Sequence, residues 1–225
     1  MVDGSWMAEY TEAGVLANLS DLGYELDDDI IEATTSICYV DDSVYLAPYM
    51  ECNVLMMNKA NVEEAGYTVD SVDSLEAVLD ICEQAKANGK NGFLYRGDNQ
   101  NNLVVDFLPI LLSYGGWVVD EENQPTVNSD EFIDAMNYYV ELIGTGEAQV
   151  KDDLVASIDN GTATMGVAWP GWYTPTADSA ADYIALSGKA TDDAQAYNAN
   201  VYGIWCLGIP SNSQNKSLRQ SCLLI

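Results

Sequence analysis

Residues 163–173 read ATMGVAWPGWY, a short apolar run that ends in two tryptophans, a proline, a glycine and a tyrosine. Gly161 lies just before the run and Pro170 ends it. An apolar run of this length between turn residues predicts a buried strand from Ala163 to Ala168. Pro170 and Gly171 then force a turn.

Three aromatic residues, Trp169, Trp172 and Tyr173, follow this strand at its end, where binding residues are commonly placed. An aromatic ring offers a flat apolar face with a polar edge. Such a face suits the C–H face of a sugar ring, while neighbouring polar side chains take its hydroxyls. Two tryptophans so close together are also typical of a hydrophobic core. The stretch by itself favours the core over a binding platform, and both interpretations stay open.

The composition is that of an acidic globular protein. The chain has 225 residues, of which 48% are hydrophobic, enough to bury a core in one large domain or two small ones. Eight Lys and Arg residues against 36 Asp and Glu residues give a net charge of −28. This charge repels nucleic acid and anionic membrane surfaces. It is also compatible with a cationic ligand, although diffuse charge is weak support for one.

Histidine is absent and cysteine is scattered. Without histidine, neither a Ser-His-Asp nor a Cys-His nucleophile system nor a histidine-based metal site exists. The five cysteines lack C-x-x-C spacing, so they carry no zinc or redox signature. We expect most of them to be buried as small apolar side chains, with room for one disulfide. We expect no metal and no cofactor.

The two ends of the sequence suggest an interrupted chain. No run of 18 apolar residues is long enough to span a membrane. The opening MVDGS lacks the basic and apolar regions of a signal peptide. The closing SCLLI is apolar and looks interrupted, so we expect a fragment or a trimmed chain.

Short strands alternate with helices along the chain, a pattern that argues for an α/β fold. The sequence predicts a helix from Trp6 to Ala17 and a loop-like connection from Ser179 to Asn200. Residues 201–209, VYGIWCLGI, predict a second buried strand with Trp205 at its middle. Further helices are predicted over residues 73–89, with a capping box at DSLE, and over 103–114, 128–144 and 154–158.

Two candidate sites of polar residues accompany the aromatic stretch. Residues 44–57 predict two strands joined at residues 48–53, and Glu51 is the one charge in these apolar surroundings. A buried acid is rare unless paired or functional, but Glu51 facing water at the break is an equal alternative. Residues 95–102 form a polar loop with one aromatic. Its candidates for binding hydroxyls are Tyr95, Arg96, Asp98 and Asn99.

In their order along the chain, several motifs resemble those of the extracellular solute-binding proteins of ABC importers, the family-1 group that includes maltose-binding protein. Each motif alone is weak support for the family. Together, in this order, they indicate the family strongly, but they do not indicate which ligand it binds. The motifs are WMAEYTEAGVLANL (6–19), VYLAPY (44–49), VLMMNK (54–59), EEAG (63–66), DSLE (73–76), GG (115–116), NS (128–129), GTATM (161–165), and the strand 201–209 followed by SNSQNK (211–216).

The resemblance implies a periplasmic-binding-protein-like, type II, two-lobe α/β fold that traps its ligand by hinge closure. The first lobe would comprise residues 1–50 and 207–225, and the second lobe residues 55–201. Residues 51–54 and 202–206 would form the hinge crossings. Family members are usually much longer, so we expect the first lobe to be incomplete, with an open sheet edge. In the full-length protein, the resemblance implies an extracytoplasmic location, as a periplasmic protein or a cell-surface lipoprotein.

Carried over position by position, the resemblance implies a set of ligand-binding residues. Those on the first lobe and crossings are Gly4, Ser5, Trp6, Glu51 and Trp205. Those on the second lobe are Trp169, Trp172 and Tyr173, in the segment that sugar binders use for stacking, and Tyr95, Arg96, Asp98 and Asn99. With the resemblance, the platform interpretation becomes the favoured one.

The resemblance implies a non-enzymatic function: a sugar or an oligosaccharide is bound in the cleft by stacking and hydroxyl hydrogen bonds, and is delivered to the membrane permease subunits of an ABC importer. Two alternatives stay open. In one, the ligand is a cationic solute such as a polyamine, and the cleft acids dominate binding. In the other, more remote one, two of the 36 acids act as a carboxylate pair on a glycoside, although none lies in a recognisable catalytic motif.

Overall fold

The computed structural model describes residues 1–203 and 205–215, and the chain divides into two compact units. Unit 1 comprises Met1–Glu51 and Tyr202–Ile225, and unit 2 comprises Cys52–Val201. The divisions thus fall after Glu51 and after Val201. Among the described residues, no helix combines the length and the apolar character needed to cross a membrane.

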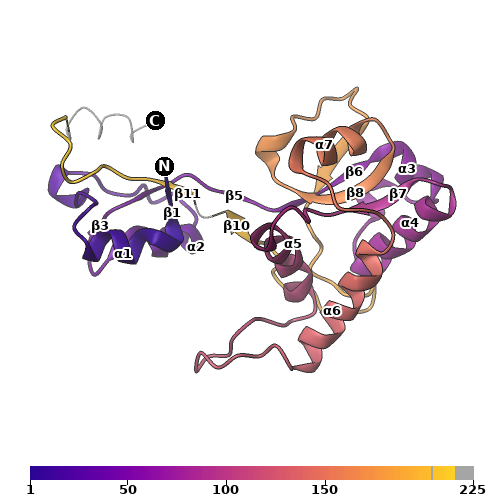
Figure 1. The fold of residues 1–225 in the computed structure, drawn as a ribbon, viewed down its shortest axis with the longest axis horizontal. Helices are drawn as coiled ribbons and strands as arrows, with labels where there is room; N and C mark the ends of the chain where they lie inside the picture. Colours follow the sequence, from indigo (N-terminus) through magenta and orange to yellow (C-terminus); the bar gives the residue numbers. More distant parts are fainter. Residues whose placement is uncertain (204, 216–225) are drawn as a thin grey trace. The chain divides into compact units, whose positions relative to one another are not determined.

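Unit 2 is built on a four-stranded sheet with the order β7-β8-β6-β9 (Figure 1). Strands β7 and β8 are parallel, whereas β6 is antiparallel to both β8 and β9. In the β6–β8 pair, Met57 lies opposite Met165 and Leu55 lies opposite Val167. The strands are β6 (Val54–Asn58), β7 (Asn91–Leu94), β8 (Ala163–Ala168) and β9 (Ala181–Ile184).

Both faces of this sheet are covered, and this explains the sequence of β8. Helices α4 and α6 cover one face, and α7 covers the other (Figure 1). Every residue of β8 is therefore buried, so the strand reads as a continuous apolar run instead of an alternating one. The helices of unit 2 are α3 (Lys59–Glu64), α4 (Leu75–Ala87), α5 (Gln100–Ser113), α6 (Asp130–Ile143) and α7 (Lys151–Asp159).

Side-chain caps begin four of these helices. Asn58, Ser74, Asn99 and Ser129 each accept a hydrogen bond from a backbone N–H in the first turn of α3, α4, α5 and α6 respectively. The cap of α4 is Ser74, one residue beyond the start of the predicted DSLE box. Each cap satisfies an N–H group that has no partner inside the helix.

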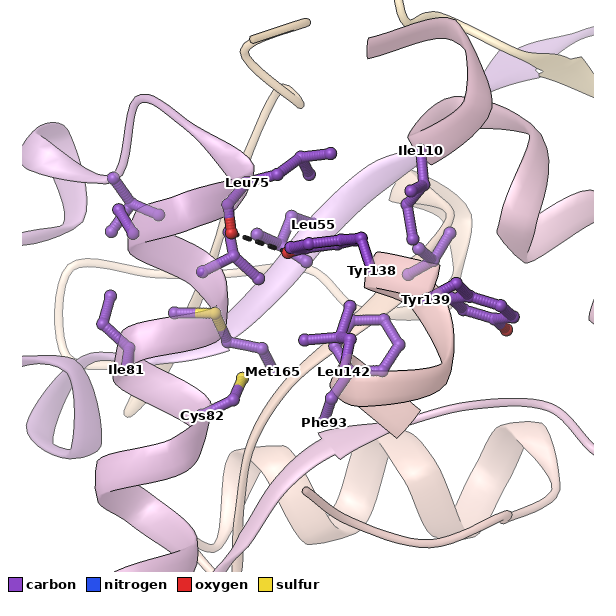
Figure 2. Packing of buried hydrophobic residues seen from close by; sticks show 14 of the residues in the cluster. Leu55, Leu75, Ile81, Cys82, Phe93, Ile110, Tyr138, Tyr139, Leu142 and Met165 are labelled. Carbon is purple, nitrogen blue, oxygen red and sulfur yellow. Dashed lines mark hydrogen bonds between the residues drawn. The ribbon is translucent and has the colours of Figure 1, made fainter. Parts of the chain in front are cut away.

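The main core of unit 2 lies between the sheet and helices α4, α5 and α6. Figure 2 shows Phe93 of β7 and Leu142 of α6 among the buried side chains of this cluster. The Tyr138 hydroxyl donates a 2.6 Å hydrogen bond to the carbonyl oxygen of Leu75, and so ties α6 to the start of α4. The neighbouring Tyr139 hydroxyl is also buried but has no hydrogen-bond partner among the described residues.

Replacing these two tyrosines by phenylalanine tests how much the Tyr138–Leu75 hydrogen bond contributes to stability. We expect Tyr138→Phe to lower the free energy of unfolding by about 1–2 kcal/mol, because a buried hydrogen bond to the Leu75 carbonyl is lost. Tyr139→Phe removes a hydroxyl that satisfies nothing, so we expect it to be neutral or stabilising. Urea denaturation followed by circular dichroism measures both. Equal losses in the two variants would contradict this account.

Unit 1 contains a three-stranded antiparallel sheet with the order β1-β11-β4 and a hairpin of β2 and β3. Its core gathers Cys38, Leu46 and Cys206 around the sheet. The strands are β1 (Val2–Asp3), β2 (Tyr39–Val40), β3 (Ser43–Val44), β4 (Ala47–Pro48) and β11 (Trp205–Leu207). The helices are α1 (Met7–Glu12) and α2 (Glu32–Thr35), with 3₁₀ turns η1 (Gly4–Trp6), η2 (Ser20–Leu22) and η3 (Ser36–Cys38).

The chain passes between the units at two places that pair with each other. Strand β5 (Glu51–Cys52) pairs with β10 (Tyr202–Gly203). Just inside unit 2, the Asn53 backbone N–H donates to the Val201 carbonyl at 2.9 Å, and the Val201 N–H donates to Asn53 Oδ1. Asn53 thus bonds to both the N–H and the carbonyl of Val201. The two ends of unit 2 therefore lie side by side.

Three elements differ from the sequence-based expectations. Helix α1 ends at Glu12, well before Ala17, because Gly14 adopts a left-handed φ of 66° and the Val15 N–H bonds back to the Tyr10 carbonyl. Strand β9 lies inside the segment 179–200 that was predicted to be a loop. Residues 201–209 contain β10 and β11 as separate strands on either side of Ile204, which is outside the described residues.

Candidate functional site

The two tryptophans that follow β8 differ in how deeply they are buried. Trp169 is buried, with 7% of its surface exposed, and its carbonyl accepts bonds from the Trp172 N–H at 2.9 Å and the Tyr183 hydroxyl at 3.3 Å. Trp172 ends the 3₁₀ turn η5 (Pro170–Trp172) and is half-buried. The turn therefore places one ring in the interior and leaves the other partly open to solvent.

Two cationic side chains lie at the Trp172 ring. The Arg96 Cζ atom is 5.1 Å from the ring centroid, and the Lys151 Nζ atom is 5.9 Å from it. A cation within about 6 Å of an indole centroid is attracted by the negative face of the ring. Only eight Lys and Arg residues occur in the chain, and two of them meet here.

Arg96 is held from behind by a buried carboxylate. Its Nε donates to both oxygens of Asp106 at 3.2 and 3.1 Å, its Nη2 donates to Asp106 Oδ1, and its Nη1 donates to Asn102 Oδ1 at 3.2 Å. Only 7% of Arg96 and 1% of Asp106 are exposed. Burial raises the pKa of the Asp106 carboxyl, and the Arg96 bonds oppose this rise. Arg96 therefore lies in the interior with its charge paired.

The polar loop continues this network to the surface. The Asn102 side chain donates to both oxygens of Asp98, at 3.0 and 3.2 Å, and this is the main reason why the pKa of Asp98 is lowered. Asn99 caps α5 by accepting from the Asn102 N–H at 2.9 Å. The Tyr95 side chain packs against the main core of unit 2, and its carbonyl accepts from the Gln149 N–H. Of these residues, Asp98 and Asn99 are exposed.

Tyr173 turns toward α7. Its hydroxyl donates to Asp159 Oδ1 at 2.7 Å, and its ring meets Tyr183 edge-on with centroids 6.2 Å apart. The pKa of Tyr173 is raised, first by burial and then by the bond to Asp159. The side chain thus has a bonded partner within the protein.

In unit 1, residues 4–6 form the turn η1. The Ser5 backbone N–H and hydroxyl donate to the same Asp3 oxygen at 2.9 and 2.7 Å, while Gly4 is buried. The Trp6 ring is 45% exposed and lies 5.9 Å from the Tyr10 ring. This turn leaves one aromatic ring open to solvent.

A row of side chains crosses the three-stranded sheet on the face away from the core. Trp205 of β11 is opposite Asp3 of β1, and the Tyr49 N–H donates to the Trp205 carbonyl at 2.9 Å. The alternate residue Cys206 is fully buried, so Trp205 projects to the other side, where 45% of it is exposed. We call Asp3, Trp205 and Tyr49 the Trp205 row. The row adds Asp3 and Tyr49 to the predicted residues.

The structure therefore gathers the predicted residues into two groups, one in each unit. In unit 2, Arg96 contacts Trp172 and is joined through Asn102 to Asp98 and Asn99, whereas Trp169 and Tyr173 have interior partners. In unit 1, Ser5 donates to Asp3, Trp205 lies opposite Asp3, and Trp6 ends the same turn as Ser5. The predicted Glu51 is half-exposed in β5.

Four members escaped the sequence reasoning: Asp3, Tyr49, Asp106 and Lys151. Lys151 opens α7, and only the fold brings it to Trp172. Tyr49 follows Pro48 in an apolar stretch, and only strand pairing shows that it faces solvent. Within the described ranges, 1–203 and 205–215, no group of three or more Cys, Asp and Glu side chains is arranged to hold a metal ion.

Solved structures with this fold are solute-binding proteins. Maltose-bound MalE3 from T. maritima is 23% identical with a TM-score of 0.78, and the match covers 100% of this chain and 60% of that one. An ABC transporter solute-binding protein from Thermotoga lettingae TMO, bound with α-D-tagatose, is 21% identical with a TM-score of 0.77, covering 98% and 59%. The GacH receptor of Streptomyces glaucescens, solved with acarbose, is 20% identical with a TM-score of 0.77, covering 98% and 58%.

These likenesses define a type II periplasmic-binding-protein-like fold in which one lobe is incomplete relative to the solved structures, since the chain spans about 60% of the length of the first of them. The sequence matches the family described as "Bacterial extracellular solute-binding protein" over residues 1–218. The chain belongs to this family, which consists of substrate-binding proteins and not of enzymes.

The contrast between the two tryptophans can be measured. We expect Trp169→Ala to lower the free energy of unfolding by about 3–5 kcal/mol, because it empties a buried site. Trp172→Ala removes a half-buried ring, and we expect it to cost about 1–2 kcal/mol. Denaturation in urea gives both values. A larger loss for Trp172→Ala than for Trp169→Ala would overturn the assignment of Trp169 to the interior.

Proposed function

We propose that the full-length protein binds a sugar or an oligosaccharide outside the cytoplasm and presents it to the permease subunits of an ABC importer. The Trp172 ring of unit 2 provides the stacking face for this ligand. The observation that carries the proposal is the partly open Trp172 ring at the end of β8, held by Arg96.

The chemistry of this ring suits a sugar. The C–H face of a pyranose or furanose packs on an indole, and a few polar groups at its edge orient the hydroxyls. Asp98 and Asn99 are exposed beside Arg96 in the same network. The three solved relatives described above support this class, since they bind maltose, α-D-tagatose and acarbose.

A polyamine is the second candidate, and the charges at Trp172 disfavour it. Arg96 and Lys151 both lie against the ring. The carboxylate nearest to Arg96, that of Asp106, is buried and bonded to the guanidinium. A polycationic ligand would therefore find the Asp106 carboxylate already occupied and would face the Lys151 ammonium, although the chain as a whole is strongly acidic.

Tryptophan fluorescence tests the choice between these ligands. The 225-residue chain is titrated with maltose, an α-1,4-linked oligosaccharide, D-tagatose, D-mannitol and spermidine. We expect a saturable change with at least one cyclic sugar, weaker binding of the acyclic mannitol because it has no ring face to stack, and no response to spermidine. Binding of spermidine alone would replace the sugar proposal by the polyamine one, and no response to any ligand from a folded sample would contradict both.

Two variants then test whether the Trp172 ring contacts the sugar. Trp172→Ala should weaken binding of the responding sugar by about 30-fold or more, because a central stacking ring is worth about 2 kcal/mol or more. Trp117→Ala is the matched control, since Trp117 is also a partly exposed tryptophan of unit 2 but is not among the contacts of the Trp172 ring. Full binding by Trp172→Ala would remove Trp172 from the site.

A further inference from the structure

Arg96 and Asp106 form a buried ion pair that has no evident benefit for stability. Asp106 accepts bonds from the Arg96 side chain and also from its backbone N–H at 3.3 Å. Taking two charges out of water costs free energy that their attraction often only repays, and an apolar pair of similar size is frequently as stable. A buried pair of this kind therefore calls for another explanation.

The explanation lies in the orientation of the Arg96 guanidinium. The Arg96 nitrogens Nε, Nη1 and Nη2 all donate to Asp106 or Asn102, in the plane of the group. These in-plane bonds fix the orientation of the guanidinium, whose centre lies 5.1 Å from the Trp172 centroid. A planar, oriented guanidinium suits contact with an aromatic face, which the flexible ammonium of a lysine does not reproduce. Because Asp106 neutralises the charge, the ring is backed by a rigid group without net charge.

We propose that Arg96, anchored by Asp106, is a positioning residue that holds the Trp172 ring in place and does not itself contact the ligand. The network reaches further, because Asn102 joins Arg96 to Asp98 on the surface. The buried Arg96–Asp106 pair thus fixes the position of the Trp172 ring relative to the exposed Asp98 carboxylate. The purpose of this positioning rests on the proposed function, whereas the positioning itself is testable without any ligand.

The first experiment observes the ring directly. The protein is labelled with 5-fluorotryptophan, and its ¹⁹F NMR spectrum has one resonance for each of the five tryptophans. The Trp172 resonance is assigned by its loss in Trp172→Phe. The test variant is the double substitution Arg96→Met with Asp106→Leu, which avoids leaving a single buried charge. We expect the Trp172 resonance to move by more than its linewidth, and the other four to stay in place.

Two further variants make this result specific. Arg96→Lys keeps the charge but loses the planar fork, so we expect it to move the Trp172 resonance as well. Lys90→Met with Glu64→Leu removes another ion pair of unit 2, whose atoms are 2.6 Å apart, and should leave Trp172 unmoved. An unmoved Trp172 resonance in the Arg96→Met/Asp106→Leu protein, with circular dichroism showing it folded, would overturn the positioning role.

Ligand binding separates the two proposals. With the sugar found by titration, we expect the double variant to bind about tenfold more weakly, a smaller loss than that of Trp172→Ala. If the Trp172 resonance moves but sugar affinity is unchanged, positioning stands and the stacking role of Trp172 fails. If affinity falls but the resonance does not move, Arg96 contacts the ligand and the positioning role fails.

A second inference comes from two cysteines in unit 1. Cys38 closes the turn η3 and Cys206 lies in β11, and both are fully buried in the same cluster. The Cys38 carbonyl accepts from the Leu46 N–H, just before β4, and Pro48 of β4 pairs with Cys206. Both are free thiols, and the Cys38 thiol donates to the Thr34 carbonyl at 3.7 Å. The interaction of the two thiols raises the pKa of Cys38 and lowers that of Cys206.

We infer that Cys38 and Cys206 form a disulfide when the protein folds outside the cytoplasm, where such bonds persist. The Cys206 thiolate attacks a small disulfide such as oxidised glutathione and releases one glutathione thiolate. Deprotonated Cys38 then attacks the Cys206 sulfur of the mixed disulfide and releases the second glutathione. The two thiols lose two electrons and two protons, and the glutathione disulfide is reduced. The bond joins the two separate chain segments that make up unit 1.

Refolding in a glutathione redox couple tests this bond. After alkylation with N-ethylmaleimide, we expect three of the five cysteines to be modified and peptide mapping to find Cys38 linked to Cys206. Cys38→Ser should abolish the link and Cys82→Ser should retain it. The oxidised protein should melt about 10 °C higher than the reduced one, since the bond closes a long loop. Five alkylated cysteines, or a link involving Cys52, would overturn the inference.

Discussion

The pairing of β6 with β8 is the constraint on which unit 2 depends. Met57 opposite Met165 and Leu55 opposite Val167 place the two strands at the centre of a sheet that is covered on both faces. Because β8 is buried along its whole length, its last residue fixes where the chain leaves the interior. The turn at Pro170 follows at once, so the register of this strand pair decides that Trp169 stays inside and Trp172 comes toward the surface.

The charged groups next to Trp172 differ in sign from the net charge of the chain. The net charge is −28, yet the charged groups against this ring are an arginine and a lysine. The arginine is paired with Asp106 in the interior, and the half-exposed lysine is paired with Asp152 at 3.3 Å, so each cation at the ring has an acidic partner of its own. Local chemistry here comes from the placement of two side chains, and the overall composition does not reveal it.

Local patterns predicted the elements of unit 2 well. The run 163–168 is β8 within the predicted bounds, and the helix caps at Ser74 and Ser129 lie where polar residues precede apolar repeats. The order of the motifs also identified the family. Strand β9 was missed because its residues ADYI lack a long apolar run, and the strand exists through its pairing with β6.

The details of the site needed long-range information. The burial of Trp169, the bond from Arg96 to Asp106 and the approach of Lys151 to Trp172 each join segments that are separate in the sequence. Residue type suggested Arg96 as a ligand group, whereas its surroundings are interior. Likewise, alternation along β11 shows that Trp205 is open to solvent only once Cys206 is known to face the core.

The two ends of unit 2 lie side by side at Asn53 and Val201, while unit 1 is assembled from chain on both sides of it. Unit 2 is thus inserted in the sequence between the two segments of unit 1. During synthesis on the ribosome, unit 2 has all its strands as soon as residue 201 has emerged. The N-terminal 51 residues must still wait for β11, because this strand is the centre of their sheet. The usual order, in which the N-terminal domain folds first, is therefore reversed in this chain.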